Sequence, residues 1–286
     1  MAPKARFMRT NLSSSPRRVH PDTIERMSSP KTVKDLVHAM EKLAPPALAE
    51  PWDNVGLVVG DEAAPLGKVL VTIDLTPEVI AEAKAGAFDS VVAYHPPVFR
   101  PEKRLLAGDL GYEAARANLS VYSPHTALDV VEGGTNDAVC AALGLRAVVG
   151  LSIRKPGDPG IGRMGWLEPQ LAARDFVARV KSRLDLPFVL VAGDLDRKIA
   201  HVAVCAGAGG ALVSAAAKSG AQAFVCGELG HHDALACVRK GMVAITTLHS
   251  NTERLALPAL AEKLGVELPG IEVAVAKRDR DPFGVL

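Results

Sequence analysis

The chain has 286 residues, of which 48% are hydrophobic and 4% aromatic, and its 33 basic and 32 acidic side chains give a formal net charge of +1. This length and composition can fill one large domain or two ordinary ones. The balanced charge provides no broad field to attract a polyanion, so direct nucleic-acid binding is not expected. Few aromatic residues and many small apolar ones favour an α/β protein.

Segments that would direct the chain to a membrane are missing from the sequence. No run reaches about 18 apolar residues, and the N-terminus lacks an apolar signal core. We therefore expect a cytoplasmic protein with no membrane partner. The cysteines form no CxxC pair, which predicts buried thiols rather than a disulfide framework.

Residues 1–30 are basic and rich in Ser and Pro, without helical or strand periodicity. This composition predicts a disordered N-terminal extension. Two other interpretations remain open: an organellar transit peptide, or a true translation start at Met27.

The first predicted element is a helix that follows Thr32. The apolar residues of TVKDLVHAMEKLAP recur at helical spacing, Thr32 suits an N-cap, and a proline pair ends the segment. The next segment, EPWDNVGLVVGDEAAP, predicts a polar turn that leads into a short strand.

The following parts of the chain predict the same order of elements twice. KVLVTIDLTPEVIAEAKAGAFDSVVAYHPP and IAHVAVCAGAGGALVSAAAKSGAQAFVCGELGHH each indicate a strand, an Ala-rich helix, a Gly-Ala stop and a second strand. Each half continues with another helix and strand. Each third strand then ends in a histidine with a carboxylate four residues later, His125 with Asp129 and His249 with Glu253.

Two such β-α-β-α-β halves require crossover connections and largely parallel pairing. We expect an α/β fold of two similar lobes, residues 31–149 and 150–286, whose largely parallel sheets face a central metal-containing cleft. Residues 150–197 predict a Pro/Gly loop, a small strand and an amphipathic helix at the start of the second lobe. Sites on parallel sheets gather beyond the carboxyl ends of the strands, so the histidines should meet there.

Five side chains at predicted strand ends are candidate metal ligands: His95, His125, Asp129, His249 and Glu253. Mixed imidazole and carboxylate ligands suit Zn, Mn, Fe or Ni, and five suffice for two ions bridged by a carboxylate. Paired ions polarise phosphoryl or carbonyl oxygens and generate hydroxide near neutral pH. A single histidine–carboxylate pair is common on solvated helices, but two pairs at equivalent positions favour a shared site.

The segment CAGAGGAL follows a predicted strand and opens a helix. Gly207 and Gly209 fit the dinucleotide fingerprint G-x-G-x-x-G, but Leu212 stands at the third glycine. A tight strand-to-helix turn is the favoured interpretation. The backbone amides of Gly207, Gly209 and Gly210 remain candidates for holding a phosphate or another anion.

The segment GELGHHDAL leaves two interpretations open. Glu228, His231 and His232 could contact a substrate at the cleft, or they could form the solvated first turn of a helix. For an enzyme, His125 and His232 are the candidates for proton transfer.

Six segments, taken in order, resemble the Nif-three-like family, also labelled GTP cyclohydrolase I type 2 homologues. The match spans nearly the whole chain from about residue 32, and the joint order of the six is more specific than any one of them. The segments are WDNVGLVVGD (52–61), VVAYHPPVF (91–99), SPHTALDVVEGGTND (123–137), VCGELGHHDAL (226–235), HSNTERLALPAL (249–260) and DRDPFGV (279–285).

The resemblance implies a two-lobed α/β fold, a dinuclear metal site between the lobes and a ring-like homo-oligomer, commonly a hexamer. It implies four metal ligands: His95, Asp129, His249 and Glu253. It also implies that His125 is a further ligand or a close neighbour of the ligands. Many bacterial members have a histidine where this chain has Tyr94, a departure that bears on the second ion position.

The favoured function is a metal-dependent hydrolase, with two divalent ions per subunit, that acts on a small nucleotide-like or phosphorylated substrate. The labels of the family also point to metal storage or delivery and to transcription-factor binding. The alternative is therefore a non-catalytic metal-handling or regulatory protein that interacts with transcription factors. A third interpretation, an NAD(P)-binding oxidoreductase, rests on the incomplete glycine run and the lobe architecture alone.

Overall fold

A computed structural model describes residues 30–153 and 158–284 of the chain. The predicted extension, residues 1–30, falls outside the described residues except for Pro30, so its disorder stays a prediction. From Lys31 onward the chain belongs to one unit. No helix in the described ranges is long and apolar enough to cross a membrane, and all four cysteines are buried and free.

The first helix, α1 (Val33–Leu43), begins where the sequence predicts. Thr32 is its N-cap and forms a capping box with Asp35, whose Oδ2 accepts the Thr32 amide at 2.8 Å. This pair satisfies donors that the first turn leaves free. Leu36 and Met40 are completely buried on the inner face of the helix.

The first sheet has five strands in the order β1-β4-β3-β2-β11. Strand β2 pairs in parallel with β3 and β11, β3 pairs in parallel with β4, and β1 pairs antiparallel with β4. The strands are β1 (Gly56–Val59), β2 (Lys68–Thr72), β3 (Ser90–Ala93), β4 (Ser120–Ser123) and β11 (Glu272–Val275). The prediction of largely parallel pairing is confirmed for this sheet.

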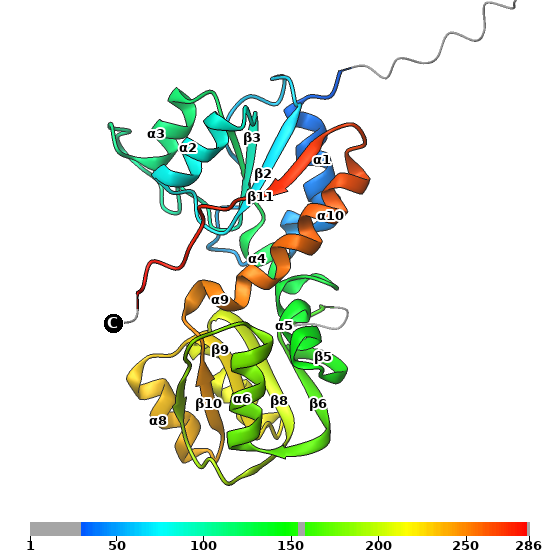
Figure 1. The fold of residues 1–286 in the computed structure, drawn as a ribbon, viewed down its shortest axis with the longest axis vertical. Helices are drawn as coiled ribbons and strands as arrows, with labels where there is room; N and C mark the ends of the chain where they lie inside the picture. The colour runs from blue at the N-terminus through cyan, green and yellow to red at the C-terminus, as the bar shows by residue number, and fades with distance from the viewer. Residues whose placement is uncertain (1–29, 154–157, 285–286) are drawn as a thin grey trace, which may run out of the picture. The chain divides into compact units, whose positions relative to one another are not determined.

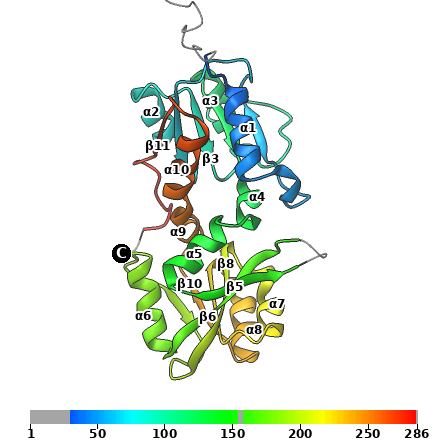
Figure 2. The ribbon, with the colours of Figure 1, turned by 90° about the vertical axis from the view of Figure 1, so that its right-hand side faces the viewer.

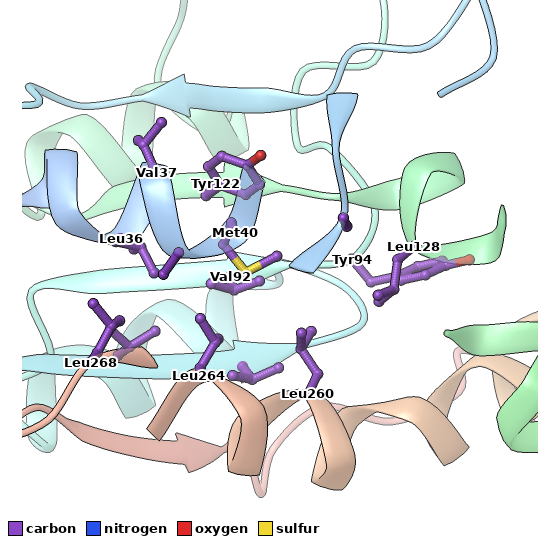
Figure 3. Close-up of a cluster of buried hydrophobic side chains, with 14 of the residues drawn as sticks. Leu36, Val37, Met40, Val92, Tyr94, Tyr122, Leu128, Leu260, Leu264 and Leu268 are labelled. Atoms are coloured by element: carbon purple, nitrogen blue, oxygen red, sulfur yellow. The ribbon is translucent and has the colours of Figure 1, made fainter. Parts of the chain in front are cut away.

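Helices cover both faces of the first sheet (Figures 1 and 2). Helices α2 (Pro77–Ala85) and α3 (Leu110–Arg116) pack on one face, while α1 and α10 (Leu257–Glu267) pack on the other. Figure 3 shows the leucine side chains of α10 directed toward the α1 layer and the sheet. Each such leucine, when fully buried, contributes about 1.5–3 kcal/mol.

The second sheet has six strands in the order β5-β6-β8-β9-β10-β7. Helices α5 (Thr135–Leu143) and α6 (Ala173–Arg183) pack on one face, and α7 (Val213–Lys218) and α8 (His231–Arg239) on the other (Figure 2). The strands are β5 (Arg146–Ser152), β6 (Ile161–Ala172), β7 (Leu190–Ala192), β8 (Lys198–Ala208), β9 (Ala223–Glu228) and β10 (Val243–Thr246).

The prediction of largely parallel pairing is wrong for the second sheet. Only β8, β9 and β10 pair in parallel, whereas β5 with β6, β6 with β8, and β10 with β7 are antiparallel. The antiparallel strands lie outside the repeated unit. The connection from β5 to β6 is too short for the crossover that parallel strands need. The predicted small strand is the 12-residue β6.

The predicted repeat is present in the structure. The elements β2-α2-β3-α3-β4 and β8-α7-β9-α8-β10 follow the same order, and each set includes three neighbouring parallel strands. A short helix follows each third strand: α4 (His125–Val130) and α9 (His249–Glu253). Both helices begin at the histidine that the sequence singles out.

After α9 the chain returns to the first sheet. Helix α10 packs there through Leu260 and Leu264, and β11 pairs with Lys68–Val71 of β2. The predicted lobe limits, 31–149 and 150–286, stay a prediction, but strand pairing assigns β11 to the first sheet. This return could not be read from the repeat, since β11 has no counterpart in it.

Candidate metal centre

One cavity of about 430 Å³ brings the two histidine–carboxylate pairs together. The histidines follow parallel strands β3, β4 and β10 at their carboxyl ends. The His95 ring centroid lies 5.2 Å from that of His125 and 5.3 Å from that of His249. All five predicted ligands line this cavity: His95, His125, Asp129, His249 and Glu253.

His95, His249 and Glu253 form a close group at the cavity wall. Each offers one ligand atom, and these atoms lie within 4.8 Å of one another. His95 Nε2 is 3.5 Å from Glu253 Oε2, and His249 Nε2 is 3.3 Å from Glu253 Oε1. Glu253 is 2% exposed, and its Oε2 has no hydrogen-bond partner in the described part of the chain. A buried carboxylate between two imidazoles fits a divalent ion.

Each of the three cavity histidines directs Nδ1 at a carboxylate. The pairs are His95–Asp74 at 2.8 Å, His125–Asp53 at 2.7 Å and His249–Glu228 at 3.2 Å. Such a contact fixes the tautomer and the ring orientation and leaves Nε2 available as a ligand. Metal-binding histidines show this arrangement, and here it occurs at all three rings.

The pKa values of His95, His249 and Glu253 show how these three side chains influence one another's charge. Burial lowers the pKa of His95, but the hydrogen bond with Asp74 and the nearby Glu253 carboxylate outweigh it and raise the pKa to about 10. The Glu253 hydrogen bond raises the pKa of His249 to about 9. Burial raises the pKa of Glu253, but both histidines outweigh it and keep the pKa lowered. The charges of the two imidazoles and of Glu253 therefore stabilise one another.

Asp129 lines the same cavity and contacts the buried side chain of Tyr94. The Tyr94 hydroxyl donates to Asp129 Oδ1 at 2.5 Å, and the two residues are 1% and 8% exposed. Burial raises the pKa of Asp129 to about 7, although the Tyr94 hydrogen bond opposes this. Asp129 and His125 do not belong to the three-ligand group. The second ion therefore stays a prediction.

Gly207 lies at the end of β8, against the three-ligand group. Its φ is +65°, and a Cβ there would lie 2.5 Å from Glu253 Oε1 and 3.2 Å from His249 Nε2. Only glycine allows the strand to approach these side chains so closely.

The predicted anion site on Gly207, Gly209 and Gly210 also stays a prediction. The Gly207 amide donates to Thr252 Oγ1 at 3.0 Å, and the Gly209 amide donates to the Glu228 carbonyl at 3.1 Å. Two of the three candidate donors therefore have acceptors within the protein.

The segment around α8 divides into two parts. Glu228 contacts His249 Nδ1, as described above, whereas His231 and His232 are exposed at the start of the helix, with ring centroids 5.4 Å apart. Neither of these two histidines lines the cavity. A proton-transfer role for His232 stays a prediction, which the cavity does not support.

Sequence reasoning missed four residues of the site: Trp52, Asp53, Asp74 and Phe99. Trp52 and Phe99 line the cavity, are 59% and 44% exposed, and have ring centroids 5.8 Å apart. Both rings lie near His125, at 6.1 and 6.2 Å. The available signals were the WDN segment and an aspartate that follows strand β2.

Comparison with known proteins gives one family. The Duf34/NIF3 (NGG1p interacting factor 3) model matches residues 31–282. A "GTP cyclohydrolase 1 type 2 homolog" of Clostridium perfringens is 31% identical over 258 residues, covering 88% of this chain and 98% of its own. A "Protein NIF3 homolog" of Schizosaccharomyces pombe is 34% identical over 282 residues, covering 90% and 99%.

Solved structures have the same fold. A Staphylococcus aureus hypothetical protein superimposes with a TM-score of 0.82 at 26% identity, covering 90% of this chain and 100% of its own. A Bacillus cereus protein related to NIF3 also has a TM-score of 0.82, at 20% identity, with coverage of 91% and 100%.

Proposed function

The chain belongs to the Duf34/NIF3 family, and from this premise we propose that it is a metal-dependent hydrolase acting on a small nucleotide-like or phosphorylated molecule. The observation that carries the proposal is the group of His95, His249 and Glu253, with a carboxylate behind each imidazole. Relatives named "GTP cyclohydrolase 1 type 2 homolog" support a nucleotide-like substrate.

The donor set fits a borderline divalent ion such as Zn, Mn, Fe or Ni. His95, His249 and Glu253 would hold the first ion, and His125 with Asp129 would add a second position. When bound, such ions supply Lewis-acid polarisation and activation of water.

Other residues of the protein orient the side chains that would take part in the reaction. Asp74 and Glu228 fix the two imidazole rings through Nδ1. The fully buried side chain of Asp53 holds His125. His125 lies between the three-ligand group and the aromatic wall, which we define as Trp52 and Phe99. It either completes the second ion position or transfers a proton to the leaving group.

The aromatic wall supports the substrate class. The cavity volume of about 430 Å³ is in the range of small-molecule sites. Trp52 and Phe99 present exposed ring surface at this cavity, and a planar heterocycle stacks favourably on such rings. A nucleobase held there would lie beside His125.

Elemental analysis followed by turnover tests the proposal. Purified protein should contain a divalent metal, and the loaded protein should hydrolyse at least one member of a panel of nucleotides and phosphate esters. Glu253→Gln should lose the metal and at least about 100-fold in kcat/KM. Trp52→Ala should raise KM while metal content stays unchanged. Undiminished turnover in Glu253→Gln would refute the proposal.

A non-catalytic metal-handling role is the second candidate, and side-chain exposure favours it. The side chains of His249 and Glu228 are 36% and 56% exposed, so an ion held there is accessible to an acceptor. Rapid transfer of the ion to a chelator, with no turnover on the whole panel, would favour this function. A transcription-factor partner and a hexameric assembly remain proposals; light scattering of the purified protein tests the latter.

A further inference from the structure

The segment DRDPFG, residues 279–284, has no part in the proposed reaction. In Figure 1 the red C-terminal segment runs from β11 toward α9. Its two carboxylates, on Asp279 and Asp281, contact the backbone of Ile73, which precedes Asp74, and the side chains of Arg254 and Ser250, which follow candidate ligands.

Asp279 is connected to the part of the site that carries His95. Its Oδ2 accepts the Ile73 amide at 2.7 Å, and the Ile73 carbonyl accepts the His95 amide at 3.0 Å. The next residue, Asp74, contacts His95 Nδ1 at 2.8 Å. One backbone position therefore joins Asp279 both to the His95 main chain and to the residue that orients its ring.

The same oxygen is connected to the part of the site that carries His249 and Glu253. Asp279 Oδ2 is 2.6 Å from Nη1 of Arg254, which directly follows Glu253. Nη2 of Arg254 donates to Ser250 Oγ at 3.3 Å, and Ser250 Oγ donates to Asp281 Oδ2 at 2.9 Å. Ser250 directly follows His249.

These contacts are shielded from water. The Asp279 side chain is 1% exposed and that of Arg254 is 23% exposed. A buried ion pair loses far more than an exposed one when one partner is removed, because the other charge is left uncompensated. The Asp279–Arg254 pair therefore holds the backbone at Ile73 and the start of the segment after Glu253 in fixed positions.

We propose that Asp279 is a positioning residue that sets the spacing between His95 and the His249–Glu253 pair, and thereby the metal affinity. Ligand distances must hold to within about 0.2 Å for tight binding, and His95 reaches the group from a different sheet than its partners. This inference rests on the proposed metal site, but not on hydrolysis.

Asp279→Asn is the direct test, since asparagine keeps an acceptor for the Ile73 amide and loses the charge that pairs with Arg254. Its Zn²⁺ affinity, measured by chelator competition, should fall about tenfold. The visible spectrum of the Co²⁺-loaded variant should shift as well, because the ligand geometry changes. Arg254→Met should have a similar effect, and the double variant should lose little more than either single one.

Glu267→Gln is the matched control. It also converts a carboxylate to an amide and breaks an ion pair, Lys42–Glu267 at 2.7 Å, but Glu267 does not line the cavity. Its Zn²⁺ affinity should change less than about twofold, and its Co²⁺ spectrum should match the wild type.

The outcomes separate this inference from the proposed function. Wild-type protein that binds no Zn²⁺ would overturn the metal site itself. If the wild type binds Zn²⁺ and Asp279→Asn shows the same affinity and Co²⁺ spectrum, the positioning role alone is overturned. The positioning role is also overturned if the unfolded fraction of the metal-free variant fully explains its loss of affinity. If Asp279→Asn does not fold, Arg254→Met takes its place, because it breaks the same ion pair; unchanged Zn²⁺ binding there would refute the inference.

Discussion

Tyr94 donates its hydroxyl hydrogen to Asp129 Oδ1, so one of the two carboxylate oxygens is already engaged within the protein. A carboxylate that bridges two ions uses both oxygens. The Tyr94 contact would therefore weaken the proposed second ion position relative to the proposed one at His95, His249 and Glu253.

Replacing Tyr94 by phenylalanine should free Asp129 Oδ1. We expect the second equivalent of Zn²⁺ to bind more tightly, because an ion can take the place of the lost donor. The metal-free variant should lose about 1–3 kcal/mol of unfolding free energy, since a buried carboxylate oxygen is left unsatisfied. Metal stoichiometry and urea unfolding measure both effects.

Tyr122→Phe is the control for this change. Tyr122 is also completely buried, but its hydroxyl has no hydrogen-bond partner among the residues that the structure describes. Its removal should leave metal binding unchanged and stability unchanged or slightly higher. Equal effects of the two substitutions would show that the Tyr94–Asp129 contact does not influence the site.

Metal binding should release protons and strengthen as pH rises. The pKa values of His95 and His249, raised to about 10 and about 9, leave both rings protonated at neutral pH in the metal-free protein. An ion must displace these protons, so affinity should increase about tenfold per pH unit for each proton released. Calorimetry in two buffers with different ionisation enthalpies counts the protons; a count of zero contradicts the assignment.

The candidate ligands could be found in the sequence because each follows a recognisable strand. Their supporting carboxylates could not, because the contacts join distant positions: Asp53 precedes His125 by 72 residues and Asp74 precedes His95 by 21. No local pattern encodes such a pair, and a lone aspartate after a strand is common in loops.

At the scale of elements, α4 and α9 are entered through strained backbone. His125 at the start of α4 has a φ of +28°, and Leu248 before α9 has a φ of +67°. Such angles in residues with a Cβ cost about 1–2 kcal/mol each. Strain of this kind persists where surrounding contacts impose it, and it is often found at functional sites. Here it occurs at both places where a helix presents a cavity histidine.

Gly207→Ala tests the close approach of β8 to the site. The new methyl group would displace Glu253 Oε1, so Zn²⁺ affinity should fall at least about tenfold. Gly220→Ala is the matched control, because its φ is +79° but no atom lies within 4 Å of the added Cβ. Both variants should lose about 1–2 kcal/mol of stability from the backbone alone. Equal Zn²⁺ affinities would contradict the proposed geometry.

The repeated elements were predictable because hydrophobic periodicity and Gly-Ala stops are local features. The antiparallel strands of the second sheet and the position of β11 were not, because strand pairing depends on partners far away in sequence. From the sequence alone, Glu272–Val275 could be a short strand of either sheet, and only its pairing with β2 assigns it to the first.

For the whole molecule, the proposed metal site should make folding stability depend on both pH and metal. Stability from His95 and His249 is fully present below their unfolded-state pKa of 6.5 and is lost as pH rises through about 9 and about 10. Asp129 acts in the same direction, since its pKa is raised from 3.8 to about 7. The metal-free protein should therefore be less stable at pH 9 than at pH 6.

Loading with metal should reverse this dependence. At a free Zn²⁺ concentration of 100 times the Kd at pH 8, the protein should gain about 2.7 kcal/mol at that pH. The same Zn²⁺ concentration should give a smaller gain at pH 6, because more protons compete with the ion and raise Kd. Urea unfolding with and without a chelator measures it. A metal-independent midpoint at both pH values would contradict the site.

The return of the chain to its first sheet has a consequence for synthesis on the ribosome. Strand β2 lacks its neighbour β11 until the last residues emerge, and the α10 leucines that cover one face of that sheet arrive only shortly before. The N-terminal half must therefore wait, with an open edge and an apolar face that only α1 covers, while the other half is translated. A nascent chain stalled after α8 should accordingly be a substrate for chaperones.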